Sequence, residues 1–197
     1  MNEFRILTVC TGNICRSPLA EQLLRAGLDG LAVTLSSAGT AALIGRPMDE
    51  RAAEYSRQYG GIPDAHVARQ LTVEHLRDAD LVLALSREHR RVVVETLPRA
   101  SRSAFTLREF ARLLETVNTD DRDTIAAQPD ARARLSTLVE IASANRGVAE
   151  RPDNPEEDDV VDPYRQDDNV YAESTRQLVP AVQSIALTLT RAAAGFE

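Results

Sequence analysis

The chain has 197 residues, a formal net charge of −7 and an apolar fraction of 43%. Domains commonly contain ~100–200 residues, so we expect a single domain over residues 1–197 with enough apolar side chains for a core. The negative charge and the lack of a basic stretch argue against nucleic-acid binding, which needs a positively charged surface. All 23 basic residues are arginine, which we interpret as the codon bias of a GC-rich bacterial genome.

The number of cysteines and the hydropathy pattern indicate where in the cell the protein is located. A small secreted domain held together by disulfides would carry more than two cysteines. The first residues lack a basic segment followed by an apolar core and a cleavage site, and no uncharged run reaches the ~18 residues of a membrane span. We therefore expect a cytoplasmic protein that does not associate with a membrane.

Strand and helix patterns alternate over the first half of the chain. The apolar, β-branched run Phe4–Val9 predicts a strand that stops at Cys10. Ser17 predicts a helix N-cap with Pro18 at the first helical position, and this helix should end near Gly30. The same reasoning predicts strands at Ala32–Ser36, Leu81–Leu85 and Ala104–Leu107, and helices at Asp49–Tyr59, Glu88–Thr96 and Leu107–Leu114. Such alternation favours a parallel sheet, whose ligands bind at the carboxyl ends of the strands.

The second half of the chain is less regular. Ala131–Ala144 is predicted to be helical, and the acidic, proline-containing run RPDNPEEDD at 151–159 is expected to be a solvated, mobile loop. A last helix is predicted from Asn169 to Ala194, with a kink or break at Pro180.

The run CTGNICRSP from Cys10 to Pro18 is the segment that most clearly indicates a reaction. A cysteine followed six residues later by arginine is weak evidence, because 23 of the 197 residues are arginine. The context is more specific, since an apolar strand ends at the cysteine and a Ser-Pro helix start closes the loop. The alternative, a buried strand-end thiol beside a surface arginine, fits this context poorly.

The loop has the residues that a phosphate-binding site needs. Successive backbone amides in a tight loop form an anion-binding nest, and the following helix directs its positive end to the same point. Arg16 offers a planar fork for two phosphoryl oxygens, and Cys10 in this positive environment should be held as a nucleophilic thiolate. Gly12 and Asn13 suit positive φ angles, and the Ser17 hydroxyl can donate to the thiolate. The predicted phosphate-binding residues are Thr11, Gly12, Asn13, Ile14, Cys15, Arg16 and Ser17.

Cleavage of a phosphate ester also needs an acid for the leaving oxygen. The best candidate is Asp162 in Asp162-Pro163-Tyr164, where Pro163 restricts the backbone and Tyr164 can form one wall of a cleft. Asp162 would protonate the departing phenolate and then activate the water that hydrolyses phosphocysteine. An isolated Asp-Pro usually marks only a turn, so this assignment depends on the Cys10 loop.

These segments together resemble the low-molecular-weight protein tyrosine phosphatases. The matching runs are CTGNICRSPLAE, similar to the phosphate loop and first helix of the family, SSAGT at 36–40, GIPDAHVARQ at 61–70, ADLVLA at 79–84 and DPY at 162–164. The resemblance implies a doubly wound α/β fold with four parallel strands and flanking helices, the phosphatase I fold. It also implies a phosphocysteine mechanism that uses no metal and no cofactor.

The resemblance assigns roles to individual residues. It carries the nucleophile to Cys10, phosphate binding to Arg16 and the general acid to Asp162. It implies a buried polar network that shapes the loop, formed by Asn13, Ser17, Ser37 and His66. His75 and His89 lie in charged helical surroundings, and we expect them to have no role.

The resemblance also bears on substrates. The expected cleft walls are Leu43 and Tyr164, and Leu43 stands where the vertebrate enzymes have an aromatic residue. In this the chain is similar to bacterial members that act on tyrosine autokinases of polysaccharide export. The implied substrate is a phosphotyrosine protein, with inorganic phosphate and vanadate as inhibitors. Residues 115–159 are not covered by the resemblance, and we interpret them as an insertion with a structural role.

Cys15 has two interpretations. Family members with this second cysteine are thought to pair it with the nucleophile under oxidation, which would make Cys15 a redox partner of Cys10. The other interpretation is a small apolar side chain packed under the loop.

Two other functions use the same features. Arsenate reductases share this fold and loop, but the thioredoxin-coupled enzymes need two further cysteines, and no cysteine follows Cys15. A reductase that uses a small external thiol stays an alternative. A non-catalytic phosphotyrosine-binding module would be expected to lose the nucleophile or the acid, whereas this chain has both Cys10 and Asp162.

Overall fold

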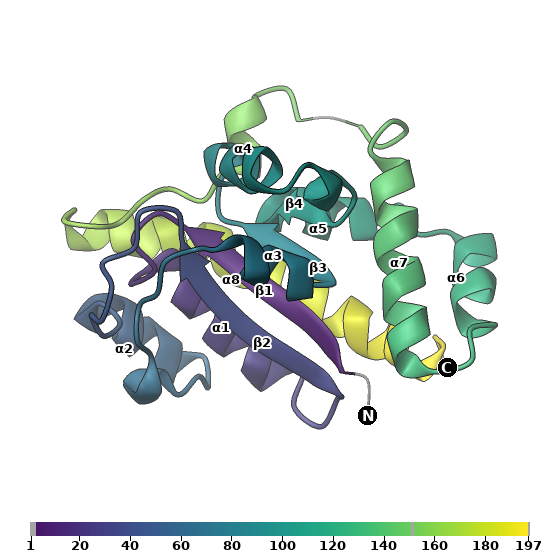
Figure 1. Cartoon of the computed structure of the whole chain (residues 1–197), viewed down its shortest axis with the longest axis horizontal. Helices are drawn as coiled ribbons and strands as arrows, with labels where there is room; N and C mark the ends of the chain where they lie inside the picture. The colour runs from purple at the N-terminus through teal and green to yellow at the C-terminus, as the bar shows by residue number, and fades with distance from the viewer. Residues whose placement is uncertain (1–2, 151, 197) are drawn as a thin grey trace.

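A four-stranded parallel sheet lies between two layers of helices in the computed structural model, which describes residues 3–150 and 152–196 (Figure 1). The strands are β1 (Phe4–Cys10), β2 (Val33–Gly39), β3 (Leu81–Ala84) and β4 (Ala104–Thr106), in the order β2-β1-β3-β4. The chain places β2 on one side of β1 and β3 on the other, which creates a topological switch point at the end of β1. The predicted doubly wound sheet is confirmed.

Helices cover both faces of the sheet. They are α1 (Arg16–Gly27), α2 (Glu50–Gln58), α3 (Val73–Asp78), α4 (Arg87–Thr96), α5 (Leu107–Leu114), α6 (Thr119–Ala126), α7 (Ala131–Asn145) and α8 (Asp168–Ala194). Short 3₁₀ turns occur at η1 (Pro63–Ala65), η2 (Pro98–Arg102) and η3 (Pro155–Asp158). Figure 1 shows α1 and α8 behind the sheet and α3 and α4 in front of it. None of the helices in the described ranges is long and apolar enough to cross a membrane.

Alternate side chains of β1 enter two apolar layers. Phe4 and Ile6 belong to the larger buried cluster, which includes residues of α1, α5, α7 and α8. Leu7 and Val9 belong to a smaller cluster with residues of α3 and α4. This period of two follows from the strand conformation, and it means that β1 is packed on both faces. Cys10 therefore stands at the end of a firmly held strand.

The start of α1 differs from the prediction. Its N-cap is Cys15, which makes no side-chain capping hydrogen bond. Because the helix begins at Arg16, Pro18 occupies the third helical position and not the first. Ser17 does not cap the helix, because its hydroxyl contacts the Cys10 sulfur instead. The uncapped amides of the first turn stay available to another acceptor.

Two predictions for the C-terminal half need correction. α8 passes through Pro180 without a break, so a break is wrong, whereas a kink at Pro180 stays a prediction. Its buried face, which includes Leu178 and Val182, packs in the main core and offsets the hydrogen bond that proline cannot make. The acidic run at 151–159, whose residue 151 lies outside the described ranges, contains η3 and two ion pairs. Asp158 pairs with Arg112 at 2.9 Å and Asp159 pairs with Arg87 at 3.0 Å, so this run is anchored rather than freely solvated.

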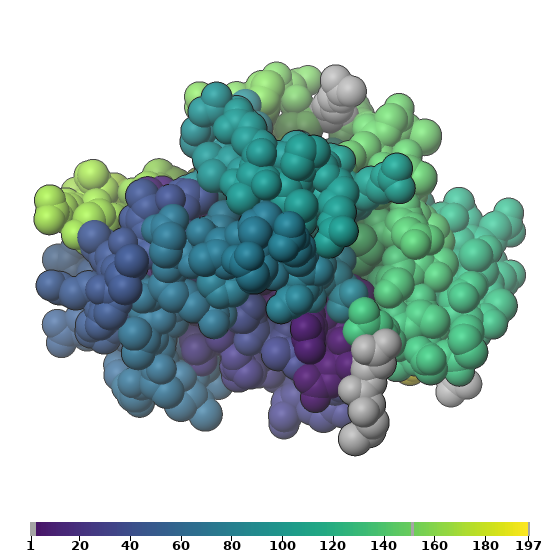
Figure 2. Space-filling view, in the orientation of Figure 1, coloured from purple at the N-terminus to yellow at the C-terminus, as the bar shows by residue number. Residues whose placement is uncertain are grey.

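Helices α6 and α7 occupy one end of the molecule, as the green region of Figure 2 shows. Ile125, Leu138 and Ala142 from these helices are fully buried in the same cluster as β1 and α8. This segment therefore completes the core. That it is an insertion, and that the whole chain is one domain, remain predictions.

Arg146, just after α7, connects this segment to β4 and α5. Its guanidinium pairs with Glu109 at 2.9 Å, donates to the Ser101 carbonyl at 2.7 Å and lies 3.9 Å from the centroid of the Phe105 ring. Replacing Arg146 with methionine should lower the free energy of unfolding by about 3 kcal/mol, because it removes the closer of the two ion pairs of the largely buried Glu109, whose other partner, Arg90, is 3.9 Å away. Urea unfolding followed by circular dichroism measures this change.

Arg57→Met is the matched control for that variant. The Arg57–Asp64 pair is exposed, with 53% and 71% of the two side chains accessible, and such pairs usually contribute less than ~1 kcal/mol. Equal losses of stability in the two variants would contradict the proposed importance of Arg146.

Candidate active site

The loop from Cys10 to Ser17 joins β1 to α1 at the carboxyl edge of the sheet. Cys10 lies opposite Gly39 of β2, and the amide of Leu85, just after β3, donates to the Val9 carbonyl. The loop thus begins at the switch point between β1 and β3, where doubly wound sheets bind their ligands. The Cys10 side chain is only 2% exposed.

Asn13 turns the loop. Its φ angle is 55°, in the left-handed region that asparagine tolerates better than most residues. Gly12 does not have a positive φ, so that part of the prediction is wrong. A Cβ atom at Gly12 would stand 3.6 Å from Ile14 and 3.8 Å from Leu43, which are ordinary contacts.

The Asn13 side chain is the centre of a polar network under the loop. Its Nδ2 donates to Ser17 Oγ at 3.0 Å and to Ser37 Oγ at 2.9 Å, and its Oδ1 accepts from the Arg69 amide at 2.9 Å. His66 donates from Nε2 to the Asn13 carbonyl at 2.7 Å, since a carbonyl oxygen can only accept. The structure thus brings together Asn13, Ser17, Ser37 and His66, and adds Arg69, which sequence reasoning missed.

Hydrogen-bond donors converge inside the loop. The backbone amides of residues 11, 12 and 14–17 donate to no atom in the described part of the chain. The Asn13 amide lies 3.3 Å from Cys10 Sγ, and Ser17 Oγ lies 2.9 Å from the same sulfur. Because Ser17 Oγ accepts from Asn13, its own hydrogen is free for the sulfur. Together with the positive end of α1, these donors can stabilise a thiolate and a bound anion.

The Arg16 side chain is buried beside the loop, and its Nε–H group is left for a ligand. Its side chain is 6% exposed, with Nη1 donating to the Val160 carbonyl at 3.0 Å and Nη2 paired with Asp162 at 2.6 Å. The Nε atom is buried and has no hydrogen-bond partner among the residues that the structure describes. A buried guanidinium N–H without an acceptor is unfavourable, so this atom is suited to an anionic ligand.

The acid segment reaches the loop from the far end of the sequence. Asp162 forms the ion pair with Arg16 and keeps its own side chain half exposed, while its Oδ1 accepts the Tyr164 amide at 3.2 Å. The Tyr164 ring is half-buried and has the Arg165 guanidinium 5.1 Å from its centroid. Leu43 is held against the loop by its amide, which donates to the Gly12 carbonyl at 3.0 Å. The expected acid and the expected cleft wall Leu43 therefore lie beside the loop.

His89 was expected to have no role, but the structure places it against the loop. Its Nε2 lies 2.8 Å from Thr11 Oγ1 and its Nδ1 lies 2.8 Å from Ser86 Oγ, and only 4% of the residue is exposed. Burial, followed by the nearby Arg16, lowers the pKa of His89 to about 4. The one local signal in the sequence was the spacing Ser86-x-x-His89, which matches a helix N-cap and its third helical residue.

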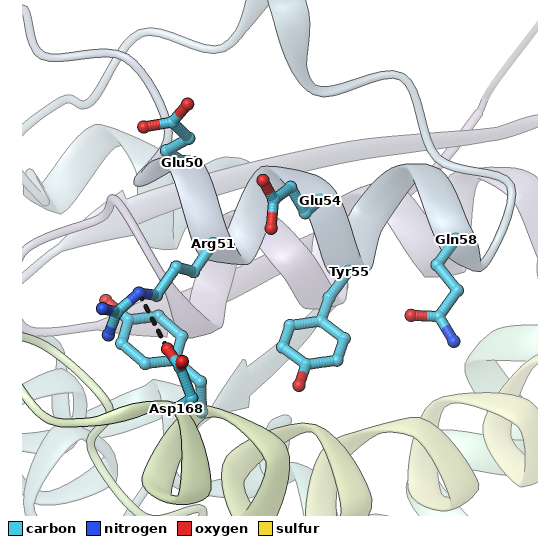
Figure 3. Close-up of a pocket in the computed structure, with 7 residues that line it drawn as sticks. Glu50, Arg51, Glu54, Tyr55, Gln58 and Asp168 are labelled. Atoms are coloured by element: carbon cyan, nitrogen blue, oxygen red, sulfur yellow. Dashed lines mark ion pairs between the residues drawn. The ribbon is translucent and has the colours of Figure 1, made fainter.

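The Cys15 side chain is buried and contacts α8. Its Sγ lies 3.9 Å from the Tyr171 hydroxyl, and burial, followed by Asp49, raises the pKa of the thiol to about 12. Tyr171 also lines a cavity of about 710 Å³ between α2 and α8, in which Arg51 and Asp168 form an ion pair at 3.1 Å (Figure 3). Cys10 and Cys15 are both free thiols. Cys15 is thus a packed, protonated thiol at neutral pH.

Comparisons with known proteins agree with this arrangement. The family model of the low molecular weight phosphotyrosine protein phosphatases matches residues 5–144. Over 84 residues the chain is 48% identical to the low molecular weight protein-tyrosine-phosphatase Etp of Escherichia coli K12, and this match covers 43% of the chain and 55% of Etp. Over 137 residues it is 39% identical to the probable low molecular weight protein-tyrosine-phosphatase EpsP of Ralstonia solanacearum, covering 68% of the chain and 90% of EpsP.

A solved structure extends the similarity to nearly the whole chain. The YwlE arginine phosphatase from Geobacillus stearothermophilus superposes with a TM-score of 0.66 and 28% identity, over 95% of this chain and 93% of YwlE. The family model alone covers more than half of the 197 residues. The chain belongs to the low molecular weight phosphotyrosine protein phosphatase family.

Proposed function

We propose that this chain is a protein tyrosine phosphatase that forms a phosphocysteine on Cys10. The observation that carries the proposal is the convergence of the unpaired loop amides, the Ser17 hydroxyl and the Arg16 Nε around one buried sulfur. Such a site binds a tetrahedral dianion and stabilises the charge that develops on its oxygens during transfer. A nucleophile at the floor of a narrow loop reaches the phosphate of a long aryl ester more easily than that of a short serine ester.

The proposed reaction has two steps. The Cys10 thiolate attacks phosphorus, the bond from phosphorus to the phenolic oxygen breaks, and the Asp162 carboxyl gives its proton to the leaving oxygen. Water then attacks the phosphocysteine, the Asp162 carboxylate takes a proton from that water, and the thiolate leaves as inorganic phosphate forms. The loop amides and Arg16 hold the three equatorial oxygens in both steps.

The proposed reaction requires that the incoming phosphoryl group breaks the ion pair between Arg16 and Asp162. The Asp162 carboxylate is paired with Nη2 of Arg16. This nitrogen lies on the same edge of the guanidinium plane as the unpartnered Nε. An incoming phosphoryl group that binds this edge through two oxygens competes with the carboxylate. Displaced from Arg16, the half-exposed Asp162 is free to turn toward the leaving oxygen.

A substrate panel tests the assignment. Initial rates would be measured in EDTA with p-nitrophenyl phosphate and with three peptides that carry phosphotyrosine, phosphoserine or phosphoarginine. We expect hydrolysis of p-nitrophenyl phosphate and of the phosphotyrosine peptide, and inhibition by vanadate and by inorganic phosphate. Arginine dephosphorylation is the second candidate, because the structural similarity to YwlE covers nearly the whole chain. Preferential hydrolysis of the phosphoarginine peptide would replace tyrosine by arginine as the substrate.

The proposed protein partner is a phosphotyrosine protein, and a bacterial tyrosine autokinase is our first candidate. The rim offers Leu43 and Tyr164 as apolar surface for the phenol ring. Leu43 is 37% exposed, so it is accessible to a peptide.

Cys15 is the proposed redox partner of Cys10. Oxidation of Cys10 by peroxide to a sulfenic acid would be followed by attack of the Cys15 sulfur, which forms the disulfide and releases water. Because burial holds Cys15 as a thiol with a pKa of about 12, we expect this second step to be slow at neutral pH. Peroxide inactivation should be reversed by dithiothreitol in the wild type and much less in Cys15→Ala. Equal recovery of activity in the two proteins would leave Cys15 with a packing role only.

A further inference from the structure

Ser86, His89 and Thr11 form a chain of hydrogen bonds across the switch point of the sheet. Ser86 caps α4 just after β3, and its Oγ accepts the His89 amide at 3.3 Å. The His89 ring then spans from Ser86 Oγ to Thr11 Oγ1, with 2.8 Å on each side. Thr11 directly follows the nucleophile, so this chain connects the end of β3 to the first residue of the phosphate loop.

The hydrogen bonds of the His89 ring fit a neutral ring that carries its hydrogen on Nε2. Ser86 Oγ already accepts the His89 amide, and its hydroxyl hydrogen has no other acceptor among the described residues. The hydroxyl hydrogen of Ser86 is therefore available to Nδ1, and in that arrangement Nδ1 is unprotonated. The ring hydrogen then resides on Nε2 and is donated to Thr11 Oγ1. Thr11 keeps its own hydroxyl hydrogen for an acceptor outside this chain of bonds.

The surroundings of His89 favour the neutral ring. Arg16 on α1 is the cation that lowers the pKa of His89, while Asp162 and Asp159 of the acid segment and Glu88 on α4 oppose its effect. Burial is the largest influence, and the resulting pKa is about 4, compared with about 6.5 for an exposed histidine. At neutral pH the ring can therefore act as a donor at Nε2 and an acceptor at Nδ1 at the same time.

We propose that His89 is a positioning residue, which holds Thr11 and the first turn of the phosphate loop in the conformation that binds the phosphoryl group. The proposal deepens the proposed phosphatase function and rests on it. His89 does not touch the reacting atoms; it fixes the Thr11 side chain through Nε2, and Ser86 fixes the ring. The loop is thereby organised before the anion arrives, which lowers the cost of binding it.

Kinetics of three variants test the proposal. His89→Leu removes both ring hydrogen bonds, and Thr11→Val removes the acceptor while it keeps the shape of the side chain. Each substitution should lower kcat/KM for p-nitrophenyl phosphate by on the order of 10–10²-fold. Because both substitutions remove the same hydrogen bond, kcat/KM of the double variant should be no lower than that of either single variant. His89→Gln, which can donate to Thr11, should recover most of the lost activity. His75→Leu, which removes a half-buried histidine from the capping box of α3, is the control and should retain wild-type rates.

A spectroscopic measurement separates this inference from the phosphatase assignment. The ¹⁵N resonances of the His89 ring should show Nε2 protonated and Nδ1 unprotonated from pH 8 to pH 5, with titration near the pKa of about 4. Calorimetric binding of inorganic phosphate should be weaker in Thr11→Val and in His89→Leu than in wild type. If the wild type hydrolyses no ester while the ring protonation and the weaker phosphate binding are observed as expected, the phosphatase assignment is wrong and the positioning role of His89 stands. A protonated Nδ1, or unchanged phosphate binding and unchanged kcat/KM in Thr11→Val, would overturn the role of His89.

Discussion

Replacement of Cys10 with serine is expected to abolish hydrolysis of p-nitrophenyl phosphate, with a loss on the order of 10⁴-fold or more. The serine hydroxyl keeps the contacts of Cys10 with Ser17 and the Asn13 amide, but it is not ionised at neutral pH and is a poor leaving group in the second step. Because the loop amides and Arg16 are unchanged, the variant should still bind inorganic phosphate.

Two measurements make this result interpretable. Thermal unfolding shows whether Cys10→Ser is folded, and calorimetric titration with phosphate shows whether its loop is intact. A folded variant that binds phosphate and retains activity within tenfold of the wild type would exclude Cys10 as the nucleophile.

Replacement of Asp162 with asparagine is expected to lower kcat by roughly 10²–10⁴-fold, the usual contribution of general acid catalysis. The loss should be larger with a phosphotyrosine peptide than with p-nitrophenyl phosphate, since the nitrophenolate is a better leaving group and depends less on protonation. The variant also loses the ion pair with Arg16, which competes with the phosphoryl group. Phosphate should therefore bind at least as tightly to Asp162→Asn as to the wild type.

Asp153→Asn is the matched control, because Asp153 is an exposed carboxylate of the same acidic region. It should retain wild-type kinetics. If Asp162→Asn lowered kcat by the same factor for the phosphotyrosine peptide and for p-nitrophenyl phosphate, the role of Asp162 as the acid would be contradicted.

The strands and the loop could be predicted from the sequence because their signals are local. An apolar run that stops at Cys10, followed by Gly, Asn and a Ser-Pro pair, determines a strand, a turn and a helix within a few residues. The left-handed conformation of Asn13 follows from the same kind of information, because a short amide side chain tolerates it.

The wrong predictions concern residues whose partners are distant in the sequence or whose local preference is overridden. Ser17 has the residue type of an N-cap, but the Cys10 sulfur and Asn13 determine where its hydroxyl points. His89 lies in charged helical surroundings that suggested no role, and only the juxtaposition of β3 with β1 brings it to Thr11. Pro180 would break an isolated helix, whereas packing against the core preserves α8.

The most direct test of the central claim is to trap the phosphorylated enzyme. Asp162→Asn would be mixed with a phosphotyrosine peptide, quenched in acid within milliseconds and analysed by mass spectrometry after proteolysis. The account predicts one added phosphoryl group on the peptide that contains Cys10, formed together with dephosphorylated substrate and absent in Cys10→Ser. Rapid release of the dephosphorylated peptide with no phosphorylated Cys10 peptide at any quench time would contradict a phosphocysteine mechanism.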